Sequence, residues 1–176
     1  SLLTGIAVVF GYTLLGATWL IYKTVGPLQE RMQSRARTLA VITLGFIGIV
    51  SAVTPFLDPV YADRWFAWPT AVFSAVVPVL LAGAAWRIYV GLRDRHDATP
   101  FLASLALFIL SFIGIGISFY PHIVPPSLTI AEAAAPESSL AFTLVGAALL
   151  LPLILAYTAY SYWVFRGKMD PDEGYH

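Results

Sequence analysis

The stretch FLASLALFILSFIGIGISFY, residues 101–120, runs for 20 residues without a charged side chain. A helix needs about 20 apolar residues to cross the hydrocarbon of a bilayer, so this stretch predicts a membrane span. Four more apolar runs of similar length cover residues 2–22, 39–57, 68–89 and 140–165. The sequence therefore predicts an all-α polytopic membrane helix bundle with five transmembrane helices, arranged as a single transmembrane domain over residues 1–176.

Composition supports a membrane protein and argues against several other classes. Hydrophobic residues make up 59% of the chain, above the roughly 45–50% of soluble domains, so the predicted surroundings are a lipid bilayer. The formal net charge is zero, which argues against a nucleic-acid partner. Cysteine is absent, which excludes disulfides and thiolate metal ligands within this chain. Ser1 opens directly into an apolar run, and we expect the chain to be a piece of a longer protein.

The basic residues predict an orientation, because short cytoplasmic loops carry an excess of Lys and Arg. Nine of the ten follow the first, third and fifth runs, and Arg64 alone follows the second. We expect the segment after the first run to be a loop, and its basic residues are Lys23, Arg31, Arg35 and Arg37. The N-terminus is therefore predicted to be extracytoplasmic and the C-terminus cytoplasmic.

The runs carry almost no ionisable side chains. No Asp, Glu, Lys or His lies deep within one, and Arg87 lies near the end of its run. Chemistry inside a membrane usually depends on a buried ionisable group. His96, His122 and His176 fall outside the runs, and no pair has metal-ligand spacing. We therefore predict no catalytic, cofactor-binding or metal residue in this chain, and expect it to support chemistry carried out elsewhere.

Small residues within the runs predict helix–helix contact surfaces, because membrane helices associate by close packing. Ser104, Ser111 and Ser118 repeat every seven residues, with Gly114 on the same side. A second set of small residues at helical spacing consists of Gly45, Gly48 and Ala52.

Two prolines leave a different function open. Pro78 and Pro152 fall inside runs and should kink their helices. Because transporters build substrate sites at such breaks, half of a small membrane transporter is one alternative. A membrane scaffold without a redox partner is another.

The segment between the fourth and fifth runs predicts a short helical turn on the outer surface. Thr129 and Glu132 have the spacing of a capping box, in which each side chain binds the other residue's backbone N–H. Pro136 should end this turn, and residues 136–139 suit the start of the last span. The carboxylates Asp58, Asp63, Glu132 and Glu137 are interpreted as solvated, capping or interface charges.

Three longer stretches carry a family resemblance. They are GATWLIYKTVGPL at 16–28 followed by Arg31, YPHIVPPSLT at 120–129 followed by AAAPESS at 133–139, and LPLILAYTAYSYWVFRGK at 151–168. Together with the tail at 172–176, they resemble subunit II of the cytochrome bd-type quinol oxidases, including the cyanide-insensitive branch.

The resemblance implies the last five spans of a nine-helix subunit in a bacterial plasma (inner) membrane. Oxidases of this family belong to the aerobic respiratory chain, where they oxidise quinol and reduce dioxygen to water. The resemblance implies that haem b and haem d, or b-type haem alone, belong to a partner subunit I together with the quinol site. Subunit II holds no haem and is needed for assembly, and small accessory subunits are further partners.

The resemblance also singles out family-motif or interface positions. We interpret the motif from Lys23 to Arg31 as an element that positions a loop. The positions are Trp19, Lys23, Thr24, Gly26, Arg31, Pro121, Pro125, Ser127, Tyr157 and Trp163.

Overall fold

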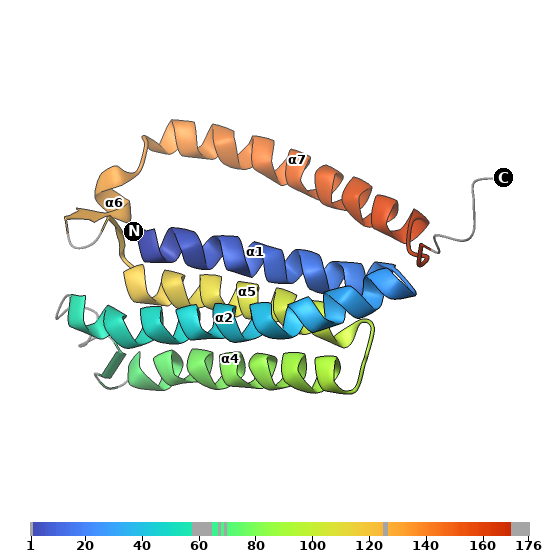
Figure 1. Cartoon of the computed structure of the whole chain (residues 1–176). Coiled ribbons are helices and arrows are strands. Elements are labelled where there is room, and N and C mark those ends of the chain that lie inside the picture. The colour runs from blue at the N-terminus through green and yellow to red at the C-terminus, as the bar shows by residue number, and fades with distance from the viewer. Residues whose placement is uncertain (1, 58–64, 67, 69, 125–126, 170–176) are drawn as a thin grey trace. The chain divides into compact units, whose positions relative to one another are not determined.

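The structure is a computed structural model, and it describes residues 2–57, 65–66, 68, 70–124 and 127–169. Five helices are long and apolar enough to cross a membrane, which confirms the predicted all-helical fold with five spans. They are α1 (Leu2–Lys23), α2 (Pro27–Leu57), α4 (Thr70–Arg93), α5 (Thr99–Phe119) and α7 (Glu137–Val164) (Figure 1). Of the residues discussed above, those outside the described ranges are Ser1, Asp58, Asp63, Arg64, Pro125 and the tail 172–176 with His176.

The chain divides into two compact units. The first contains the described residues up to Tyr120 together with Lys168 and Met169, and the second contains Pro121–Gly167. In the first unit, α1 packs most extensively on α2, and α4 on α5, while α1–α5 and α2–α4 contacts close a ring of four helices. Short connections at 24–26 and 94–98 reverse the chain, so both lie at one end of this bundle (Figure 1). We call these two connections and the helix turns beside them the charged end.

The core of the bundle lies in the half nearest the charged end. Its buried apolar residues are Leu14, Ala17, Ile21, Ala36, Ala40, Ala84, Ile88, Leu92, Ala103 and Leu107. Gly11 marks a close approach of α1 to α5, because a Cβ there would lie 2.7 Å from Phe108 Cζ. Gly114 faces α4, where a Cβ would lie 3.2 Å from Val77 Cγ1. Gly114 of α5 therefore lies in a helix contact, as the sequence predicts. The contact surface predicted at Gly45, Gly48 and Ala52 of α2 was wrong for this bundle, because these residues are exposed and a Cβ on either glycine would have no atom of another helix within 4 Å.

Helix α2 begins much earlier than the second apolar run. The prediction of a loop before residue 39 was wrong, because the chain is helical from Pro27 onward. Gly26 has a φ of 71°, which glycine adopts without steric cost, and Pro27 suits the first helical position. Glu30 adds an acidic side chain to the first turn. Arg31 therefore lies on a helix, one that continues into the second predicted span.

The second unit combines a strand pair with two helices. Strands β1 (His122–Val124) and β2 (Leu128–Thr129) pair antiparallel, with His122 opposite Thr129, in a segment for which no strand was predicted. The predicted capping box of α6 (Ile130–Ala133) is confirmed, since Thr129 and Glu132 each bind the other's backbone N–H. Helix α7 follows from Glu137, and none of its residues is buried.

Candidate functional site

At the charged end, a lysine side chain lies against aromatic rings. Lys23 is the last residue of α1 and is only 6% exposed. Its Nζ lies 5.4 Å from the ring centroid of Trp19 and 5.7 Å from that of Tyr22, where the negative ring faces attract a cation. Phe101 of α5 packs on both rings, with centroids 4.9 Å from Trp19 and 6.1 Å from Tyr22. The lysine is thus held on an aromatic surface shared by α1 and α5.

The turn after Lys23 sets where α2 begins. The backbone N–H and the hydroxyl of Thr24 both donate to the carbonyl of Leu20, at 2.9 and 2.7 Å, and satisfy one of the free carbonyls at the end of α1. The backbone N–H of Glu30 donates to the carbonyl of Gly26 at 3.2 Å. The motif residues Thr24 and Gly26 therefore shape a tight connection between two antiparallel helices.

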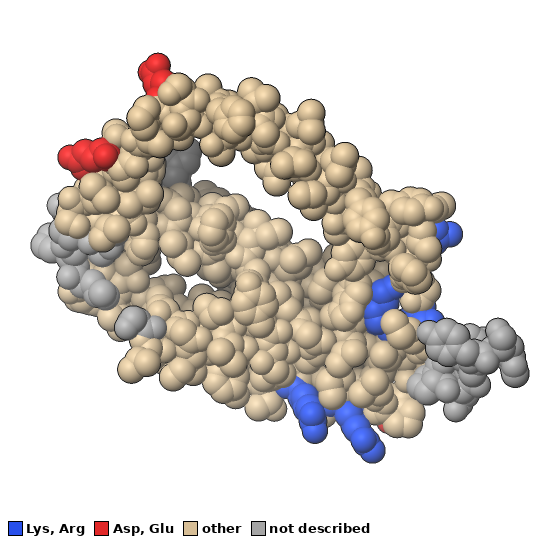
Figure 2. Space-filling model, turned by 90° about the horizontal axis from the view of Figure 1, so that it is seen from above, with Lys and Arg blue, Asp and Glu red and all other residues tan. Residues whose placement is uncertain are grey.

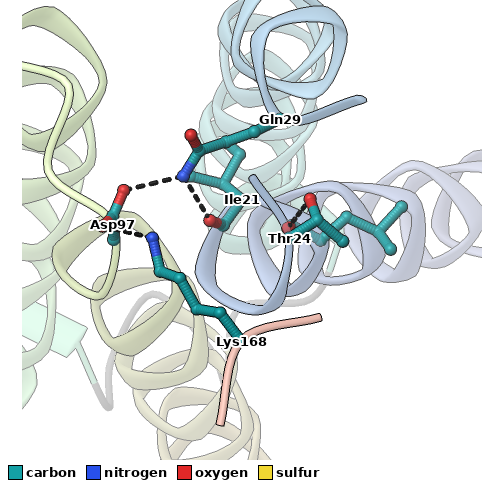
Figure 3. A network of polar contacts seen from close by, with 6 residues as sticks. Ile21, Thr24, Gln29, Asp97 and Lys168 are labelled. Carbon is teal, nitrogen blue, oxygen red and sulfur yellow. Dashed lines mark hydrogen bonds and ion pairs between the residues drawn. The ribbon is translucent and has the colours of Figure 1, made fainter. Parts of the chain in front are cut away.

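A polar network joins this turn to the α4–α5 connection (Figure 3). Gln29 Nε2 donates to the carbonyl of Ile21 at 3.0 Å and to Asp97 Oδ1 at 2.8 Å. Lys168 Nζ donates to the other carboxylate oxygen of Asp97. The backbone N–H of Met169 donates to the carbonyl of Lys23 at 2.7 Å. One carboxylate thus links both connections to the segment that follows residue 167.

Further charges lie at this end of the bundle, and Figure 2 shows Lys and Arg gathered toward the right of the view. Arg37 Nη2 donates to the carbonyl of Leu92 at 3.0 Å, a favourable place for a cation because helix C-termini are electronegative. Arg95 Nη1 lies 3.7 Å from Glu30 Oε1. Arg93 donates a hydrogen bond to Asp94 and thereby holds the pKa of that carboxyl below its usual value.

The motif residues fall into two groups. Trp19, Lys23, Thr24 and Gly26 come together at the charged end, whereas Arg31 is exposed on the second turn of α2. The second group lies in the other unit.

In that unit, the motif residues form a turn and the end of a helix. The carbonyl of Pro121 accepts a hydrogen bond from the N–H of Ile130 at 2.8 Å, and the N–H of Ser127 donates to the carbonyl of Val124 at 2.9 Å. Tyr157 and Trp163 are mostly exposed on α7. The guanidinium carbon of Arg166 lies 4.8 Å from the Trp163 ring centroid. The Arg166 cation therefore lies over this ring, next to the C-terminal end of α7.

Sequence reasoning missed Gln29 and Asp97 as members of the network. A glutamine in the first turn of a helix and an aspartate just before one are ordinary features of helix ends, and 68 positions separate the two residues. Only the hairpin geometry of the bundle brings them together. Lys168 was noted for its charge, but its acidic partner was not.

Chemically, the described arrangement offers helix-end contacts and a polar network. Within the described ranges, no three His, Cys, Asp or Glu side chains gather as a group that could hold a metal ion. Hydroxyls are the buried polar side chains deeper in the bundle, and Thr18 donates to the carbonyl of Leu14 at 2.9 Å. The site is thus suited to holding helices in place.

The comparisons with known proteins agree on one family. Residues 1–165 match the family model described as cytochrome bd terminal oxidase subunit II. The chain is 26% identical over 209 residues to cytochrome bd-I ubiquinol oxidase subunit 2 of Escherichia coli strain K12, covering 98% of this chain and 53% of that protein. It is 25% identical over 180 residues to cytochrome bd ubiquinol oxidase subunit 2 of Bacillus subtilis strain 168, covering 98% and 51%. The resemblance inferred from the motifs is confirmed, and the chain spans about half the length of the curated relatives it matches.

Proposed function

Because the chain belongs to the cytochrome bd terminal oxidase subunit II family, we propose that it is the C-terminal half of a non-haem structural and assembly subunit of a terminal quinol oxidase. The complex oxidises quinol and reduces dioxygen to water in aerobic respiration. Its haem b and haem d, or b-type haem alone, lie in a partner subunit I together with the quinol site. Small accessory subunits complete the assembly.

The match over residues 1–165 is the observation that carries this proposal. The interior of the bundle adds support. Its buried side chains are apolar or hydroxyl-bearing away from the charged end, and the buried Lys23 sits at that end. Catalytic and cofactor-binding groups in membranes are usually costly ionisable side chains. A bundle packed in this way contributes shape and stability to a complex.

The charged end supports a role in assembly. The Asp97 network and the aromatic seat of Lys23 fix how four helices end relative to one another. A partner that docks on a rigid bundle does not have to order it, so less conformational entropy is lost on association. The motif residues Trp19, Lys23 and Thr24 act in this proposal as positioning residues for the bundle.

This multi-pass membrane protein is further proposed to lie in a bacterial plasma membrane with its charged end in the cytoplasm, following the positive-inside rule. The chain has no cysteine, so single cysteines can report the orientation. With other cysteines of the full-length subunit replaced, Ser127→Cys should react with an impermeant maleimide in intact spheroplasts. Ser34→Cys should react only after the membrane is opened. The reverse pattern would contradict the proposed orientation.

The function itself is tested on the full-length gene product. A C-terminal affinity tag, mild detergent and a reduced-minus-oxidised spectrum report whether a haem-bearing partner co-purifies, and an untagged strain is the control. Haem b or d bands that stay with a larger partner when the subunits are separated would support the proposal. A pure chain without any haem-bearing partner would reject it in favour of a transporter or a scaffold.

A further inference from the structure

Two arginines on the outer face of α2 form a like-charged pair. Arg31 and Arg35 are both exposed and lie one helical turn apart. Residues at this spacing are neighbours on a helix surface, and like charges there repel and destabilise the helix. An anion bound between the two guanidinium groups would turn this repulsion into an attraction.

Three acidic side chains of the charged end are already engaged with other cations. Glu30 faces Arg95, Asp94 faces Arg93, and Asp97 faces Lys168. Within the described residues, no ion pair involves Arg31 or Arg35. The pair therefore presents two positive charges outward, and guanidinium groups suit phosphate because they bind two oxygens of one phosphate at once.

The position of the pair along α2 matches the phosphate level of a bilayer. From residue 39 to residue 57, α2 rises about 27 Å, close to the roughly 30 Å of hydrocarbon in a typical membrane. Arg35 lies about 6 Å beyond residue 39, and each headgroup layer is about 5–8 Å thick. Arg31 lies one turn further out, and arginine side chains of this length reach along the interface.

The same side of α2 continues as an apolar path away from the arginines. Gly45, Ile49 and Phe56 follow at helical spacing and are all exposed. A Cβ built on Gly45 would have no atom within 4 Å outside its own stretch of helix, so the surface there is open. A molecule with an anionic head and long apolar tails would contact both parts of this face.

We propose that Arg31 and Arg35, together with the apolar face of α2 beside them, bind an anionic phospholipid of the adjoining leaflet. The two guanidinium groups bind the lipid phosphate, and the acyl chains lie along α2 past Gly45. The inference depends on the chain being a multi-pass membrane protein and not on its role in an oxidase.

The test uses the purified full-length complex, washed free of loosely bound lipid in detergent. Phosphatidylglycerol, phosphatidylcholine and inorganic phosphate are added separately, and bound lipid and thermal stability are measured. Each arginine near an anionic surface is worth about a five-fold change in affinity. Arg31→Gln with Arg35→Gln should therefore weaken phosphatidylglycerol binding by about 25-fold. Binding of phosphatidylcholine should not change.

Two further variants control for charge and folding. Arg95→Gln removes a positive charge at the same end but from an existing ion pair, and it should leave phosphatidylglycerol binding within about two-fold of wild type. Arg31→Lys with Arg35→Lys keeps the charges and should retain most of the binding. Unchanged phosphatidylglycerol binding in the double glutamine variant would overturn the proposal, as would equal stabilisation by inorganic phosphate.

The acidic tail of the same chain is the competing occupant. Asp170, Asp172 and Glu173 lie outside the described residues, and neutralising all three should leave phosphatidylglycerol binding unchanged. A clear rise in lipid binding in that variant would mean that the tail, and not a lipid, occupies the arginine pair.

Discussion

Helices α5 and α7 have the same mean hydropathy over their most apolar stretch, yet they differ in packing. In α5, Ala103, Ser104 and Leu107 are buried against the other helices of the bundle, whereas no residue of α7 is buried. Hydropathy decides whether a helix enters a bilayer, because that depends on transfer of side chains into lipid. Packing depends on close contact with neighbouring helices, since lipid tails are as apolar as the side chains.

The largest test of this difference compares leucines of the two helices. Leu107 is fully buried in α5, and Leu151 is 56% exposed in α7. Leu107→Ala should lower the unfolding free energy of the purified full-length complex by about 2–5 kcal/mol, because it leaves a cavity. Leu151→Ala should change it by less than about 0.5 kcal/mol. Similar losses in both variants would mean that α7 is packed as tightly in the complex as α5.

A second test fills the space between α1 and α5. Gly11→Leu must displace the ring of Phe108, whose Cζ lies 2.7 Å from the position of a Cβ. Overpacking of this kind costs about 1–3 kcal/mol. Gly16 is the matched control on the same helix, because a Cβ there meets nothing within 4 Å. Gly16→Leu should be neutral or gain up to about 1 kcal/mol from helix propensity, and thermal unfolding of the complex compares the two.

The polar contacts at the end of the bundle give a smaller expected effect. Asp97→Ala removes the acceptor of both Gln29 and Lys168 and should destabilise the subunit by about 1 kcal/mol. The effect stays this small because the Lys168–Asp97 ion pair is partly exposed to solvent. Asp94→Ala removes only an exposed contact to the adjacent Arg93 and should have no measurable effect on the unfolding midpoint. Equal effects of the two variants would show that the network linking the connections adds nothing to stability.

The smallest effect concerns the turn that precedes α7. Hydrogen bonds from the backbone and side chain of Thr129 hold the pKa of Glu132 below its ordinary value. The stabilisation of the α6 turn is therefore complete above that ordinary value and is lost as pH falls through the lowered pKa. The protection of the Thr129 amide against hydrogen exchange, relative to the intrinsic exchange rate at each pH, should fall over this acidic range in the wild type. Glu132→Gln should remove most of that pH dependence, while Glu137→Gln on α7 should leave it intact.

The sequence predicts the parts of this fold that depend on local composition. Five apolar runs were enough for five helices, and the spacing of Thr129 and Glu132 was enough for a capping box. The early start of α2 was missed because arginines interrupt the apolar pattern before residue 39. Pro27 and Glu30 were nevertheless available as signals of a helix start.

The candidate site was less predictable, for a physical reason. The seat of Lys23 on Trp19 and Tyr22 is local to one helix, and the motif at its end drew attention to it. The contacts of Asp97 and Phe101 reach across from a different hairpin. A single sequence carries no periodic or compositional signal for such a pairing, because it depends on how two hairpins are aligned.

The pairing of sequence neighbours in the bundle has a consequence for biogenesis. The most extensive helix contacts join α1 to α2 and α4 to α5, and each pair is separated by only a few residues. Each hairpin can therefore form as soon as its second helix leaves the insertion machinery, before the next helix is synthesised. Contacts between close neighbours in sequence also form fast. The α1–α5 and α2–α4 contacts between the hairpins then form within the plane of the membrane. Assembly of the bundle becomes the docking of two preformed hairpins.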